Sequence, residues 1–309
     1  MENLNAAEDN PSINISLPDK LESKMNQAFS VDCQFIVGEN LGKPKTIFGH
    51  KLIFALNSEV FESMFSGNFM EAKFTRIPLP DDDPNAFRNL RIILYNLRDA
   101  SQEVEELNVS DTISLYKLCD KYMFTTIAKL CREHLKKLIE KSNHDDALKI
   151  FDATVAFSNL KLLEPIKTKL LANDYSTSLP TLYELDYVSF MKYIELKIEC
   201  NLSNHMPIFD AIEKYILDNN LIPQQLRATD KSTKKIGRTT ATTFGQEDVV
   251  LLSDERSMEL MEKLLSYVDF AKITIEDFIS GPGTSNILTW KQKYTLLSEL
   301  NAVDLCGFC

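Results

Sequence analysis

The chain has 309 residues, and its content of 44% hydrophobic and 26% charged residues is ordinary for a globular protein of about two domains. Asp and Glu number 45 against 34 Lys and Arg, and the formal net charge of −11 argues against a chain-wide contact with nucleic acid or an anionic membrane. Residues 1–11 lack the apolar core of a secretion signal, and no apolar run approaches the ~20 residues of a membrane-spanning helix.

The N-terminal part of the sequence predicts a mobile segment followed by a pair of strands. Residues 1–20 are polar and contain prolines, so we expect a mobile N-terminus. Apolar and polar residues alternate over Val31–Val37 as in a half-buried strand, and Thr46–Phe48 returns after a turn at residues 38–43. Short apolar helices are expected to follow over residues 50–65.

Helical spacing of apolar residues then continues to residue 140. It predicts helices over residues 84–97, from about Ser110 to Tyr122, and from Thr125 to Leu138. The acidic stretch Asp99–Asn108 between two of them is predicted to be a surface loop. These elements form a predicted domain over residues 21–140.

Beyond Ser142 the pattern is helical throughout, which indicates a bundle or a solenoid. We expect a first helical part over residues 141–227 and a second over residues 248–309. Residues 228–247 between them are predicted to be a flexible polar and basic loop, because residues 228–243 contain mainly Thr, Lys and other small or polar residues that cannot form a core.

Three strings of residues in the N-terminal part resemble the BTB (POZ) domain, a protein-interaction fold, in both residue type and spacing. They are Asp32-x-x-Phe35-x-Val37-Gly38, then Phe48-x-His50-Lys51, then Ser58-x-x-Phe61-x-x-Met64-Phe65. The helical remainder resembles the BACK domain that commonly follows BTB. The resemblance therefore implies an α/β BTB domain followed by an all-α BACK-like helical array. It is closest in kind to the BTB-BACK-PHR subgroup of cullin-3 adaptors, although no PHR β-sandwich is expected in this sequence.

This resemblance implies a non-catalytic adaptor that recruits substrates to a cullin-3 RING ubiquitin ligase and acts as a BTB-mediated homodimer. Its partners would be cullin-3, a second copy or a related BTB protein, and an unknown protein substrate. Two alternatives stay open. The chain could be a BTB scaffold or transcriptional co-regulator that works without cullin, or a truncated family member that competes with longer adaptors.

The resemblance also implies specific site residues. Phe69-Met70-Glu71 is in register with the apolar-x-Glu element by which BTB adaptors dock on cullin-3, with Tyr122 and Met123 as a companion surface. The alternative is that Phe69 and Met70 are core residues. Asp32 and Lys51 occupy the positions of a charged pair near the BTB dimer seam, where a buried charge would need its partner; otherwise they are solvated ends of a strand and a helix.

The basic loop offers a further candidate site for an acidic partner, unless it is an idle insertion. Its basic residues are Lys231, Lys234, Lys235 and Arg238.

No motif in the sequence indicates an enzyme, a metal site or a cofactor. Phosphate loops and metalloprotease or hydrolase motifs are absent. His50 has no second His or Cys at ligand spacing, so we expect a hydrogen-bonded structural histidine. Most of the six cysteines lie in apolar patterns, where free Cys behaves as a small hydrophobe. A reduced protein of the cytoplasm or the nucleus is therefore expected.

Overall fold

The computed structural model describes residues 30–66, 69–96, 99–157, 160–172, 179–199, 203–222 and 254–306. The chain divides into two compact units, Met1–Ser142 and Asn143–Cys309. The predicted mobile N-terminus at residues 1–20 and the predicted basic loop at residues 228–247 lie outside the described residues.

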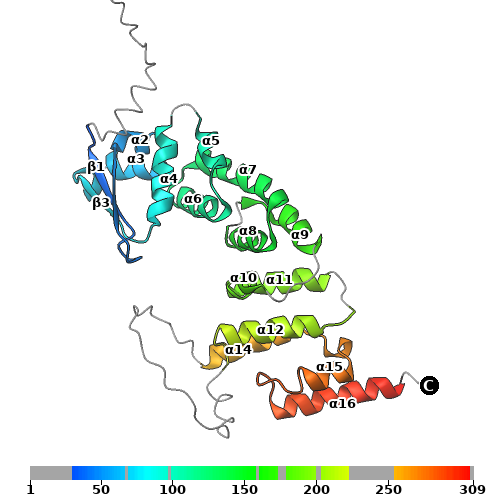
Figure 1. Ribbon diagram of the computed structural model, residues 1–309. Coiled ribbons are helices and arrows are strands. Elements are labelled where there is room, and N and C mark those ends of the chain that lie inside the picture. The colour runs from blue at the N-terminus through cyan, green and yellow to red at the C-terminus, as the bar shows by residue number, and fades with distance from the viewer. Residues whose placement is uncertain are drawn as a thin grey trace, which may run out of the picture. The chain divides into compact units, whose positions relative to one another are not determined.

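A three-stranded sheet forms the start of the first unit (Figure 1), with β1 (Cys33–Val37) between β2 (Lys45–Gly49) and β3 (Arg76–Leu79). Strands β1 and β2 are antiparallel, as the sequence predicts, and strands β1 and β3 are parallel. The third strand was not predicted. It has four residues, and one of them is Pro78, which has no N–H to donate and is tolerated in an edge strand such as this one.

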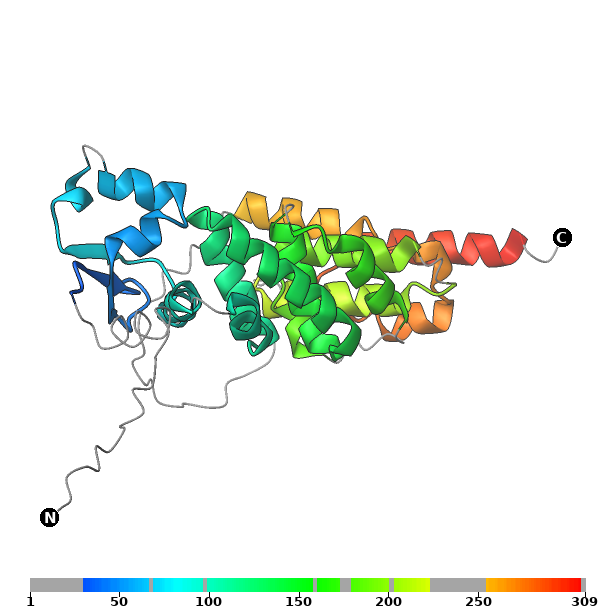
Figure 2. The same ribbon diagram turned by 90° about the horizontal axis from the view of Figure 1, so that it is seen from above.

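Seven helical segments follow in the part of the first unit that the structure describes, and α2 and α3 stand beside the sheet (Figure 2). The ring of Phe35 on β1 lies 4.6 Å from that of Phe54 on α2, 5.8 Å from Phe61 on α3 and 4.9 Å from Phe87 on α4. This aromatic core attaches the helices to the sheet. The segments are α2 (Lys51–Ala55), α3 (Glu59–Ser66), the 3-10 turn η1 (Met70–Ala72), α4 (Pro84–Tyr95), α5 (Ala100–Glu105), α6 (Val109–Lys121) and α7 (Thr125–Lys141).

Helix α5 corrects the prediction of a surface loop over Asp99–Asn108. The Asp99 carboxylate caps the helix by accepting a hydrogen bond from the Gln102 N–H at 3.0 Å. Val104 is only 1% exposed and anchors this short acidic helix.

Every described element of the second unit is helical, which confirms that a mostly helical region follows the sheet-containing unit. In Figure 1 the helices follow one another as pairs, and contacts join α8 to α9, α11 to α8 and α9, α12 to α14, and α15 to α16. The elements are α8 (His144–Ala156), α9 (Leu163–Ala172), α10 (Pro180–Tyr183), α11 (Tyr187–Glu199), α12 (Met206–Asp218), α14 (Asp254–Leu265), the 3-10 turn η3 (Phe270–Lys272), α15 (Ile275–Ser280) and α16 (Trp290–Cys306).

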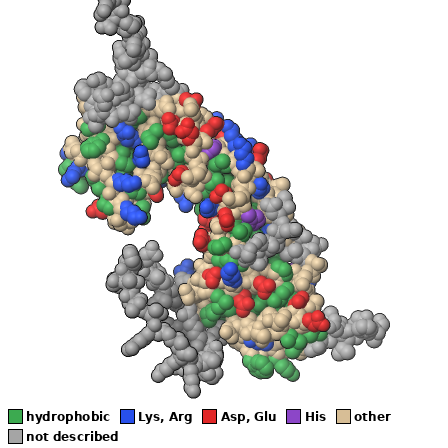
Figure 3. Space-filling model, in the orientation of Figure 1, with side chains coloured by type: hydrophobic (Ala, Val, Ile, Leu, Met, Phe, Trp, Pro, Cys, Tyr) green, Lys and Arg blue, Asp and Glu red, His purple; other side chains and the backbone are tan. Residues whose placement is uncertain are grey.

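Acidic side chains are scattered over the surface of this unit on the face shown in Figure 3. Hydrophobic side chains gather at its lower end, where Figure 1 places α16. That helix carries the exposed side chains of Trp290 and Tyr294. None of the described helices combines the length and the apolar character needed to cross a membrane.

Candidate docking surface

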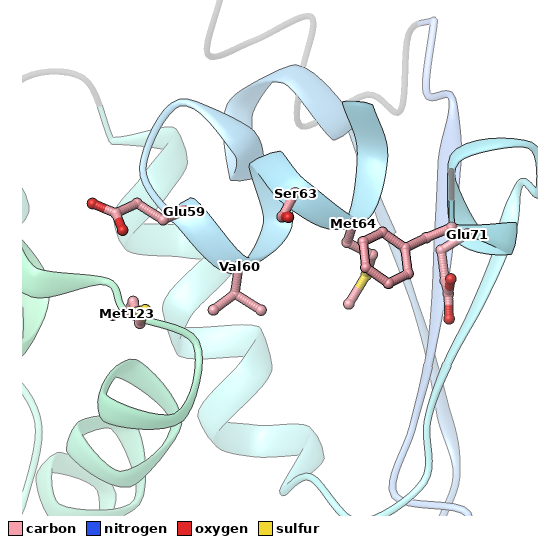
Figure 4. A pocket seen from close by; sticks show the side chains of 7 residues that line it. Glu59, Val60, Ser63, Met64, Glu71 and Met123 are labelled. Carbon is pink, nitrogen blue, oxygen red and sulfur yellow. The ribbon is translucent and has the colours of Figure 1, made fainter. Parts of the chain in front are cut away.

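An apolar groove of about 550 Å³ opens on the first unit between α3, the segment that leads into η1, and the turn between α6 and α7. Figure 4 shows Val60, Ser63 and Met64 along its middle, with Glu59 and Glu71 at opposite ends. The remaining lining residues are Phe69 and Met123. The groove therefore has an apolar floor with a carboxylate at each end.

Helix α3 supplies one wall because its two faces differ in character. Phe61 is fully buried in the aromatic core, whereas Val60 and Met64, four residues apart, point to the groove. The Ser58 hydroxyl caps this helix by accepting from the Phe61 N–H at 3.0 Å, and it donates to the Tyr122 carbonyl oxygen at 2.5 Å. One buried hydroxyl thus ties the start of α3 to the turn that carries Met123.

The predicted docking segment forms the opposite wall. Phe69 is extended, with φ −75° and ψ 151°, and precedes the 3-10 turn η1 that contains Met70 and Glu71. Phe69 is 57% exposed and Met70 is 69% exposed, which argues against the core interpretation of these two residues. Phe69 and Glu71 line the groove, and Met70 adds exposed apolar surface beside them.

Met123 completes the groove at the end of α6. It has a positive φ of 58°, its N–H donates to the Asp120 carbonyl at 3.3 Å, and the Phe124 N–H donates to the Cys119 carbonyl at 2.9 Å. This is a Schellman ending with methionine at the position where glycine is usual. The Met123 side chain is 49% exposed and lines the groove.

Tyr122 differs from the other predicted docking residues because its side chain is only 6% exposed. Its hydroxyl donates to the Asp82 carboxylate, which also accepts from Lys121 at 2.6 Å. Burial and this hydrogen bond raise the pKa of the Tyr122 hydroxyl. The residue supports the turn from below and presents no side chain to a partner.

Asp32 and Lys51 are neighbours, but their charges have separate partners. Asp32 is exposed and accepts from the Lys51 backbone N–H at 2.8 Å. The Lys51 ammonium instead donates to the carbonyl oxygens of Glu71 and Ala72, each at 3.0 Å. Among the described residues of this single chain, no ion pair joins Asp32 and Lys51, and their predicted place at a dimer seam stays a prediction.

The predicted structural role of His50 agrees with its contacts, since its Nδ1 lies 2.9 Å from the Tyr95 hydroxyl, which also accepts from the His50 N–H. In the part of the chain that the structure describes, no group of three or more His, Cys, Asp or Glu side chains could hold a metal ion. The predicted basic site at Lys231, Lys234, Lys235 and Arg238 lies outside the described residues.

Sequence reasoning missed the wall of the groove that α3 provides. Its residues are Glu59, Val60, Ser63 and Met64. The available signal was helical spacing, because these positions share one face of a helix whose other face carries the phenylalanines.

Comparison with known proteins identifies the first unit. Residues 21–139 match the BTB/POZ domain family. Human BTB/POZ domain-containing protein 6 is 23% identical over 279 residues, which cover 90% of this chain and 45% of that protein. Its counterpart in Xenopus laevis is 34% identical over 118 residues, 38% of this chain and 21% of that protein. Human BTB/POZ domain-containing protein 3 is 24% identical over 283 residues, 91% of this chain and 45% of that protein.

The resemblance to the BTB/POZ domain inferred from the sequence is thereby confirmed for residues 21–139. Residues 21–139 match a BTB/POZ domain, a mostly helical region follows them, and the chain is similar to BTB/POZ domain-containing proteins 6 and 3 over most of its length. It spans about half the length of these relatives.

Proposed function

We propose, taking the BTB/POZ domain at residues 21–139 as the premise, that this chain is a non-catalytic adaptor that docks on cullin-3 through the groove on α3 and η1. The observation that carries the proposal is the exposure of Phe69 and Met70. Phe69 lines the groove together with Glu71 and Met123, and Met70 lies next to Phe69 in the chain. Exposed large apolar side chains around a concave apolar surface are typical of a protein-interaction site.

The groove defines the chemistry of its occupant. The groove accepts apolar side chains of a partner, because its apolar lining consists of Val60, Met64, Phe69 and Met123. The carboxylates of Glu59 and Glu71 at its two ends favour basic or hydrogen-bond-donating groups on that partner, because charge-assisted hydrogen bonds fix its orientation.

Self-association is the second part of the proposed function, because a dimeric adaptor would present two docking grooves and two substrate sites. An apolar patch on the first unit suits a second copy. It consists of Phe48 on β2, Leu52 and Leu56 on α2, and Ile92 on α4, which are 43%, 65%, 72% and 36% exposed. Helix α4 contacts both α2 and β2, and on this ground we propose that the four side chains form one patch.

The double variant Phe69→Ala and Glu71→Ala tests the docking proposal. Loss of a hot-spot side chain costs ~2 kcal/mol or more, so affinity of the purified chain for cullin-3 should fall about thirtyfold or more in calorimetric titration. Because both side chains lie at the surface, the melting temperature should stay nearly unchanged.

The matched control is Phe74→Ala with Glu39→Ala, which also removes one exposed ring and one exposed carboxylate, but away from the groove lining. Equal binding by the wild type and the docking variant would reject cullin docking at this groove and favour the scaffold alternative. Equal losses in both double variants would show that the groove is not the site.

A further inference from the structure

Lys51 makes a contact that none of the functions considered so far explains. Its Nζ donates to the carbonyl oxygens of Glu71 and Ala72, each at 3.0 Å. These carbonyls end the 3-10 turn η1, whose own hydrogen bonds run from the Ala72 N–H to Phe69 and from the Lys73 N–H to Met70. The last carbonyls of a helical turn have no partner within it, so the ammonium supplies the missing donors.

The Lys51 side chain is itself held in place. Its backbone N–H donates to the Asp32 carboxylate at 2.8 Å, and its Nζ lies 5.4 Å from the centre of the Phe65 ring. Phe65 in turn packs on Phe61, with ring centres 5.5 Å apart, and so belongs to the aromatic core. The donor that faces η1 is therefore fixed relative to the sheet and α3.

We infer that Lys51 is a positioning residue that holds the docking segment, Phe69–Ala72, in the conformation that binds a partner. The inference rests on the proposed function for the identity of the partner. Because η1 is a single three-residue turn without a buried side chain, its order depends on contacts from outside the segment. A segment that is ordered before binding avoids the loss of conformational freedom on binding, and affinity rises accordingly.

A different role for Lys51 would give a different result. Lys51 is the first residue of α2, and the next residue, Leu52, belongs to the apolar patch proposed for self-association. If Lys51 were chiefly a charge at a dimer seam, its removal would shift the monomer–dimer equilibrium and leave η1 unchanged.

The test compares Lys51→Met with Lys73→Met. Lys51→Met keeps the length of the side chain and removes its donors, whereas Lys73→Met removes an exposed charge next to η1 and leaves the backbone N–H that donates to Met70. Amide exchange of the full-length chain is followed by NMR at Ala72 and Lys73. We expect about tenfold faster exchange in Lys51→Met, no change in Lys73→Met, and recovery in Lys51→Arg, because local opening of the turn controls these rates. Equal exchange in the wild type and Lys51→Met would overturn the inference.

Binding to cullin-3 then separates this inference from the proposed function. Roughly tenfold weaker binding by Lys51→Met, with an unchanged monomer–dimer equilibrium, supports the positioning role. Faster exchange with unchanged binding overturns it, as does a shift in self-association without faster exchange. If the wild type does not bind cullin-3, the proposed function fails, whereas the exchange rates at η1 still decide whether Lys51 holds the segment.

Discussion

Met123 has a backbone conformation that glycine adopts more easily than any other residue, and yet it presents a half-exposed side chain to the groove. A left-handed conformation costs a non-glycine residue about 1–2 kcal/mol. An unfavourable residue at an interaction surface is a common compromise between stability and function. The conformation therefore points to a role for the thioether in binding.

Met123→Gly and Met123→Ala separate these two contributions. Both remove the side chain, but only glycine relieves the left-handed strain, so the first unit of Met123→Gly should be more stable than that of Met123→Ala by about 1 kcal/mol. Native-state hydrogen exchange of the slowest amides in residues 30–141 measures this difference in the full-length chain. Both variants should bind cullin-3 more weakly, roughly fivefold for ~1 kcal/mol of lost contact. A glycine variant that binds as well as the wild type would remove Met123 from the docking site.

Single residues could be predicted from the sequence where their role depends on local order along the chain. Phe69 and Glu71 were nominated because Phe69-Met70-Glu71 resembles the apolar-x-Glu element of BTB adaptors, and both line the groove. Tyr122 was nominated with its neighbour Met123, but the turn directs one side chain to Asp82 and the other to the surface. Tertiary packing decides which of two adjacent side chains is exposed. A spacing pattern in the sequence carries no information about that packing.

Secondary-structure elements were predictable where they were long enough to show a period. The amphipathic helices α4, α6 and α7 were all predicted, and their buried positions recur at helical spacing. Strand β3 and helix α5 were missed because four and six residues show too little of a period. Their contacts define them instead: β3 pairs with β1, and α5 buries the side chain of Val104.

Helix α12 is linked to η3 by a histidine that can change its charge. His205 is 2% exposed, and its Nδ1 accepts from the Asp269 N–H at 3.0 Å. The backbone N–H of His205 donates to the Lys272 carbonyl oxygen at 3.3 Å. Burial, and then the charge of Lys272, lower the pKa of His205, while the Asp269 carboxylate opposes them. Protonation would convert Nδ1 from an acceptor to a donor and break the link to Asp269.

The second unit should therefore lose stability as the pH falls below about 6.5, the ordinary histidine pKa. Because the folded-state pKa is lowered, the unfolded chain binds the proton first, and stability present above pH 6.5 is lost toward the folded pKa. His205→Asn keeps an acceptor for the Asp269 N–H but does not titrate. Between pH 7.5 and 5.5 its melting temperature should fall less than that of the wild type, by about 2–4 °C for ~1 kcal/mol.

His144 also has a lowered pKa, caused by burial and then by Lys197, so some acid sensitivity should remain in His205→Asn. Calorimetry at the two pH values gives the comparison. An identical loss in the wild type and the variant would contradict the assignment of this effect to His205.

At the scale of the whole molecule, the first unit has two separate apolar surfaces, the docking groove and the patch of Phe48, Leu52, Leu56 and Ile92. None of the four patch residues lines the groove, so the proposed contact with a second copy would not use the groove lining. Two linked grooves would raise the effective concentration of each docked partner for the other. The patch therefore predicts an assembly in which self-association and docking are independent.

Leu52→Asp with Leu56→Asp tests that assembly. Two carboxylates per subunit would be buried without partners at the contact, and each costs several kcal/mol, so the dissociation constant of the dimer should rise at least about 100-fold. Sedimentation at micromolar concentration should give twice the chain mass of 35.3 kDa for the wild type and the single mass for the variant. Val188→Asp with Leu217→Asp changes two similarly exposed apolar residues of the second unit and should leave the dimer intact. A monomeric wild type, or dissociation of this control as well, would contradict the patch as the dimer contact.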